Sequence, residues 1–163
     1  MSANTLTGIF APGSPALLET LRTLVLTPAA STEPGALIRA EFTFLNVGGA
    51  VATGVRARFA LPAGVEAVPG SDTIDDAPLC DGESFIASNG ASVGELESNV
   101  SRRISITYKV DDVLEDGTEL TFQAAVVSDQ LAIAGSNMER LAVRSKPVLQ
   151  NPGTLVTIIA SDT

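Results

Sequence analysis

The sequence predicts an all-β fold, an immunoglobulin-like antiparallel β-sandwich with extra strand segments towards both termini. Apolar and polar residues alternate along several stretches, turn residues separate these stretches at short intervals, and helical periodicity is almost absent. At 163 residues the chain is about one domain long. We divide it into an N-terminal arm with a first strand (1–33), a sandwich core (34–129), and C-terminal strands or an assembly arm (130–163).

The first element has two interpretations. Ser14-Pro15 is typical of a helix start, and the leucines that follow fit a helical stripe. The same residues also alternate as they would in an extended strand. We predict a first strand from Leu21 to Thr27, and a helical turn before it stays open.

The strand signals are clearest after Pro34. The first of these strands is predicted to point four apolar side chains inward, namely Ile38, Ala40, Phe42 and Phe44. Gly48-Gly49 forms the next turn, because glycine accepts positive φ. The strand that follows is predicted to point Val55, Ala57, Phe59 and Leu61 inward, and Arg56 and Arg58 outward.

Shorter elements complete the predicted sandwich. We expect a short strand from Val65 to Val68, an acidic loop over 71–78, short strands over 84–87 and 92–96, and a long strand over 100–110. A polar turn over 111–118 leads to a last strand with Leu120, Phe122, Ala124 and Val126 inward. The architecture therefore depends on four inward side chains: Phe42, Phe59, Ile106 and Phe122.

Several motifs together suggest a family. Pro34-Gly35, Asn46 followed by Gly48, the corner Leu61-Pro62-Ala63-Gly64-Val65, and the strands over 104–110 and 124–128 carry the likeness. This region, 34–129, resembles the conserved-repeat domain of bacterial and archaeal surface proteins, catalogued as domain of unknown function eleven. The resemblance implies an immunoglobulin-like unit used as a stalk, spacer or adhesive module, here in a single copy. The Asn46 side chain is expected to bond the backbone of its turn.

Composition argues against several classes of function. The chain carries a net charge of −9 and no histidine, so we predict no nucleic-acid partner and no histidine-based catalysis. Carboxylates gather at Asp72, Asp75 and Asp76 and again at Asp111, Asp112, Glu115 and Asp116, but without the spacing of a known calcium loop. We interpret both groups as solvated turns and predict no enzyme activity, catalytic residue, cofactor or metal site.

Two further features have a plain and a sharper interpretation. Arg56, Arg58, Arg102 and Arg103 would form a local basic patch if they shared one sheet. Cys80 is the only cysteine, which excludes an intrachain disulfide. We favour a thiol that is buried or idle, with an intermolecular bridge as the alternative.

The chain ends suggest where assembly could occur. Leu155, Val156, Thr157, Ile158 and Ile159 form a strongly β-prone segment, and Ile9 and Phe10 end a short apolar one. Such a segment pairs readily with an open sheet edge, either of its own sandwich or of a neighbouring subunit. We predict these residues, if any, to mediate assembly.

The predicted role is therefore structural. We expect a non-enzymatic building block or stalk of a surface or filamentous assembly, a homo-oligomer or a module docked on a larger assembly through sheet edges. The start of the sequence lacks a signal-peptide pattern and no apolar run is long enough to span a membrane, so we predict an extracellular surface or a virion without membrane insertion. A virion decoration protein and a glycan-binding adhesion module are the alternatives.

Overall fold

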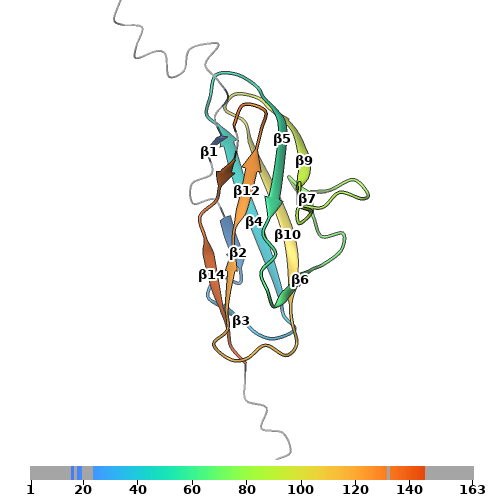
Figure 1. Cartoon of the computed structure of the whole chain (residues 1–163), viewed down its shortest axis with the longest axis vertical. Coiled ribbons are helices and arrows are strands. Elements are labelled where there is room, and N and C mark those ends of the chain that lie inside the picture. The colour runs from blue at the N-terminus through green and yellow to red at the C-terminus, as the bar shows by residue number, and fades with distance from the viewer. Residues whose placement is uncertain (1–15, 17, 20–23, 132, 146–163) are drawn as a thin grey trace, which may run out of the picture.

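The computed structural model describes residues 16, 18–19, 24–131 and 133–145. These residues form two packed β layers (Figure 1), and among them no helix is long and apolar enough to cross a membrane. The predicted all-β, immunoglobulin-like sandwich is confirmed. The predicted assembly residues Ile9 and Phe10 and the segment 155–159 lie outside the described residues.

The first layer is a seven-stranded sheet. Its main path is β1 (Leu18–Glu19), β4 (Leu37–Asn46), β10 (Ser101–Val110), β7 (Thr73–Ile74) and β8 (Ala77–Pro78), with β2 (Leu24–Thr27) also beside β4 and β6 (Val65–Ala67) also beside β10. Every pairing in this sheet is antiparallel. The two long central strands are paired from Ser101 with Leu45 to Lys109 with Leu37, which makes β4 and β10 the backbone of this layer.

The second layer combines two smaller sheets. One contains β13 (Ala134–Gly135), β12 (Ala124–Val127), β5 (Ala52–Phe59) and β9 (Ala91–Leu96), and the other contains β11 (Glu119–Phe122), β14 (Glu139–Val143) and β3 (Ser31–Thr32). Only Gln123 separates β11 from β12, so these two strands are pieces of the single strand that alternation predicted. The two smaller sheets therefore continue each other along the sandwich (Figure 1).

The core contains the side chains on which the prediction depended. Phe42, Phe59, Ile106 and Phe122 are all buried, with no more than 4% of any of them exposed. The rings of Phe42 and Phe59 meet edge to face across the layers at 6.5 Å. The burial of each such side chain contributes about 1.5–3 kcal/mol to stability, so the alternation in the sequence reports the true core.

Asn46 joins the two layers at one end of β4. Its amide nitrogen donates hydrogen bonds to the carbonyl oxygens of Ala50 and Leu96, each at 2.8 Å, and its Oδ1 accepts the Gly48 N–H at 3.0 Å. The predicted bond from Asn46 to the backbone of its turn is confirmed. Because Leu96 belongs to β9, this buried amide also links the seven-stranded sheet to the opposite layer.

The structure corrects three local predictions. Leu61 was expected to point inward, but β5 ends at Phe59 and half of Leu61 is exposed. The segment 84–87 is a turn rather than a strand, and Phe85 within it is buried. The predicted acidic loop over 71–78 contains the hairpin of β7 and β8, because Asp75 and Asp76 both adopt the positive φ of a tight turn.

Candidate assembly surface

Two arginines occupy the outer face of the four-stranded sheet. Arg56 and Arg58 lie two positions apart on β5, on the face opposite to the buried Val55, Ala57 and Phe59. Their Cα atoms are therefore about 7 Å apart along the strand. The outward orientation of these two residues was predicted and is confirmed.

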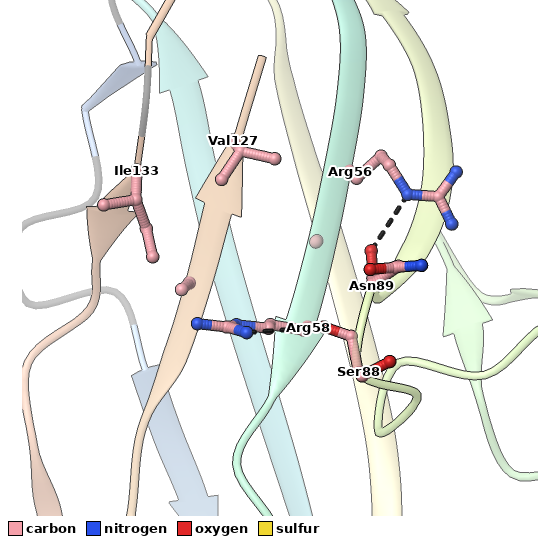
Figure 2. A pocket seen from close by; sticks show the side chains of 8 residues that line it. Arg56, Arg58, Ser88, Asn89, Val127 and Ile133 are labelled. Carbon is pink, nitrogen blue, oxygen red and sulfur yellow. Dashed lines mark hydrogen bonds between the residues drawn. The ribbon is translucent and has the colours of Figure 1, made fainter.

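The arginines hold the turn that leads into β9. Arg56 donates from Nε to the Asn89 carbonyl at 2.9 Å, as Figure 2 shows. It also donates from Nη2 to the Gly90 carbonyl at 2.8 Å, and Arg58 donates from Nη1 to the Ser88 carbonyl at 3.4 Å. Gly90 has φ of +66°, and a Cβ there would lie 2.3 Å from the Ala57 carbonyl oxygen. The 88–90 turn therefore packs directly on the backbone of β5, and only glycine permits this approach.

An open groove runs between this turn and the neighbouring strands. Its volume is about 590 Å³, and beside the two arginines it is lined by Ala125, Val127 and Ile133. Figure 2 shows the last two on the side of the groove opposite to Asn89. Ile133 is 53% exposed, so the groove combines cationic donors with accessible apolar surface.

The groove carries positive charge that no described carboxylate neutralises. Within the described ranges, neither Arg56 nor Arg58 forms an ion pair with a carboxylate. Arg102 and Arg103 lie on β10 in the other layer and pair with Asp75 and Asp76. The predicted basic patch of four arginines on one sheet is therefore wrong, because alternation defines the face of a strand but not the sheet that receives it.

The same sheet ends in the longest described edge strand, β9, which has six residues. Its N–H groups are partly occupied by side chains: Ser92 N–H donates to Glu83 Oε2 at 3.2 Å and Gly94 N–H donates to Ser92 Oγ at 3.4 Å. A shift in register between β5 and β9 also interrupts the ladder. These devices limit uncontrolled strand pairing at an exposed edge.

The first acidic group matches its prediction in part, because Asp75 and Asp76 are exposed on the β7–β8 turn but Asp72 is not. Asp72 is buried, with 7% exposed, and its Oδ2 accepts the Phe85 N–H at 3.0 Å. Asp75 and Asp76 fold over β10 and pair with arginines. Among the described residues no group of three or more histidine, cysteine, aspartate or glutamate side chains is arranged to hold a metal ion.

The second acidic group matches its prediction more closely. Asp111, Asp112, Glu115 and Asp116 are all exposed on the turn after β10. Val113, at the tip of the same turn, is 87% exposed. The sequence pattern gave no reason to notice this valine, because it lies outside any alternating stretch.

Cys80 is an exposed free thiol. Of the two favoured alternatives, buried or idle, the buried one is therefore wrong. Cys80 lines a separate hollow beside Asp72, Asp81 and Glu83.

Comparisons with known proteins support the fold. No family model matches this chain, and no curated protein matches it either. Among solved structures, the chain is similar to BslA, a bacterial hydrophobin, with a TM-score of 0.50 and 19% identity over 82% of this chain and 98% of that one. It is also similar to BcpA, the major pilin subunit of Bacillus cereus, with a TM-score of 0.55 and 10% identity over 79% of this chain.

These likenesses are structural. This chain covers only 40% of the pilin subunit, and both identities are too low to show more than a shared fold. They agree with the immunoglobulin-like sandwich that the family resemblance implied. Membership of the conserved-repeat family itself stays a prediction, since no family model matches.

Proposed function

We propose that this chain is a non-enzymatic structural module, an immunoglobulin-like building block of a surface or filamentous assembly. The observation that carries this proposal is that the buried polar side chains form hydrogen bonds that hold the fold together. Asn46, Asp72 and Ser105 each form hydrogen bonds that fix a turn or a neighbouring strand. In the described part of the chain, the only buried side-chain polar atom without a partner is Thr32 Oγ1, an isolated hydroxyl.

The surfaces support the same role. One outer face carries an open groove with two arginines that have no carboxylate partner in the described part of the chain, and an acidic turn projects from one end of the sandwich. Such features suit contacts between protein surfaces of opposite charge. The net charge of −9 disfavours nucleic acid and anionic lipid as partners.

The similar structures also support a location. One is that of a bacterial hydrophobin and another that of a major pilin subunit. We infer an extracellular surface as the place of action, with a virion as the alternative setting. Immunofluorescence on intact cells of the source organism tests this inference, and labelling that requires permeabilised cells contradicts it.

Self-assembly of the purified full chain tests the proposal. Sedimentation velocity over a wide concentration range is expected to show oligomers that grow with concentration, and electron microscopy is expected to show fibres or closed particles. A chain that stays monomeric at every concentration contradicts assembly from copies of this chain.

A truncation after Gln150 tests the predicted role of Leu155–Ile159. If this segment donates a strand to a neighbour, the truncated chain folds but no longer assembles. If it pairs within its own sandwich, the truncation lowers the melting temperature instead. Unchanged folding and unchanged assembly would remove the segment from the proposal.

A further inference from the structure

Most hydrogen-bond donors of Arg56 and Arg58 have no acceptor in the part of the chain that the structure describes. A guanidinium has five N–H donors; the 88–90 turn takes two from Arg56 and one from Arg58. Three donors of Arg56 and four of Arg58 therefore have no acceptor among the described residues. A complementary ligand would supply carboxylates to these donors and an apolar group to Val127 and Ile133.

The turn after β10 has this chemistry. Asp111, Asp112 and Glu115 are exposed, and the exposed Val113 lies between them in the sequence. Among the described residues, the only cation within ion-pair distance of these carboxylates is Lys109, whose Nζ lies 3.9 Å from Asp112 Oδ2. The turn therefore keeps a surplus of negative charge around one projecting apolar side chain.

The turn is also held in a fixed shape. Asp111 N–H donates to the Gly64 carbonyl at 3.0 Å, and Gly117 N–H donates to the Val143 carbonyl at 2.8 Å. Leu114 packs over Gly64, where an added Cβ would lie 3.0 Å from it. A preorganised turn loses little conformational entropy on binding, which favours its use as a contact.

We propose that the groove beside Arg56 and Arg58 binds the 111–116 turn of a second copy of this chain. This inference rests on the proposed structural role and names its contact. The groove lies on the side of the sandwich, whereas the turn follows β10 at the end near β3 and β6 (Figure 1). The contact is therefore head to side, and repeated contacts of this kind build a ring or an open filament.

Two neutral variants test the contact in the full chain. The groove variant is Arg56→Gln with Arg58→Gln, and the turn variant is Asp112→Asn with Glu115→Gln. Each alone is expected to weaken self-association by about tenfold or more, since each removes charge-assisted contacts from the interface. An equimolar mixture is expected to form a heterodimer that grows no further, because only one groove and one turn in the pair remain intact.

Matched controls separate this contact from a general effect of charge. Arg144→Gln removes an exposed arginine that has no ion pair among the described residues. Glu95→Gln with Glu97→Gln removes two exposed carboxylates on and just after β9, outside the turn. Both controls are expected to assemble as the unchanged chain does, and circular dichroism confirms that every variant is folded.

The outcomes distinguish this contact from the wider role. If the groove and turn variants assemble normally, the contact is wrong and the structural role stands. If the unchanged chain never self-associates, both the contact and the proposed structural role are wrong as stated. If the unchanged chain is monomeric and binds alginate, and the groove variant does not, the groove is a site for an acidic polysaccharide and the contact between copies is overturned.

Discussion

The arginines on the two outer faces of this sandwich have different partners. On the seven-stranded sheet, Arg102 and Arg103 pair with the carboxylates of Asp75 and Asp76. On the four-stranded sheet, all hydrogen bonds from Arg56 and Arg58 to described residues go to backbone carbonyls. Arginine is therefore paired with carboxylates on one face, and on the other it has no carboxylate partner among the described residues.

The difference comes from the turn that covers each face. The Asp75-Asp76 turn of the β7–β8 hairpin brings two carboxylates over β10. The 88–90 turn brings Ser88, Asn89 and Gly90 over β5, and none of these carries a charge. The arginines of the seven-stranded sheet therefore form ion pairs within the molecule, whereas those of the four-stranded sheet have N–H donors available to a partner.

The largest expected loss of stability comes from a substitution at Asn46, which links the two layers of the sandwich. Asn46→Ala leaves the carbonyls of Ala50 and Leu96 and the N–H of Gly48 without their partner. Each buried group left unsatisfied costs about 1–3 kcal/mol, so we expect a loss of about 3 kcal/mol or more in the free energy of unfolding. Urea denaturation measures it, and a loss below about 1 kcal/mol would mean that solvent replaces these bonds.

The next effect concerns only the unpaired face. Gly90→Ala places a Cβ against the Ala57 carbonyl oxygen, in a backbone conformation with φ of +66°. We expect a loss of about 2–3 kcal/mol, from left-handed strain of about 1 kcal/mol and displacement of the 88–90 turn. Thermal or urea unfolding measures this loss, and crystallography of the variant shows whether the arginines lose their carbonyl acceptors.

Gly82→Ala is the matched control for this substitution. Gly82 has φ of +86°, but no atom lies within 4 Å of its added Cβ. Its cost is expected to be the strain alone, about 1 kcal/mol. Equal losses in the two variants would show that the close approach of Gly90 to β5 adds nothing.

Some of this arrangement was readable from the sequence. Period-two alternation identified the inward residues of β4 and β5, because successive side chains of a strand point to opposite sides. The same rule placed Arg56 and Arg58 outward. The Asn46 turn was also predictable, because an asparagine side chain commonly bonds the backbone two residues on.

The charge pairing was not readable in the same way. Asp75 and Arg102 are 27 residues apart, and only the pairing of β7 with β10 brings them together. The burial of Asp72 likewise depends on the position of Phe85, in a segment that was expected to be a strand. Alternation describes one strand at a time, so contacts between elements lie beyond it.

Tyr108 provides a probe of the core that both faces enclose. Burial, with a smaller effect from the negative charge of Asp72, raises the pKa of the Tyr108 phenol well above its usual value. The unfolded chain releases this proton near pH 10, whereas the folded chain retains it. Stability is therefore unaffected below pH 10, and above it the free energy of unfolding is expected to fall by about 1.4 kcal/mol per pH unit.

The tyrosinate absorbance checks this expectation directly, because Tyr108 is the only tyrosine in the chain. In the native protein no tyrosinate should form until the pH reaches the unfolding transition. Variants of either outer face should titrate in the same way. A titration midpoint near 10 in the folded protein would show that the phenol is accessible to solvent.

The smallest expected changes in stability come from replacing one arginine on each outer face. Arg103→Gln removes the ion pair with Asp76, and an exposed pair of this kind contributes about 0.2–1 kcal/mol. Arg58→Gln removes one long hydrogen bond, at 3.4 Å, and also the repulsion from Arg56, so its net effect on the monomer is expected to be near zero. Urea unfolding at low salt measures both. High salt should shrink the effect of Arg103→Gln, because ions screen exposed pairs. If Arg58→Gln instead destabilises the monomer as much as Arg103→Gln does, then Arg58 stabilises the monomer itself. The proposal that it is available to bind a partner is then contradicted.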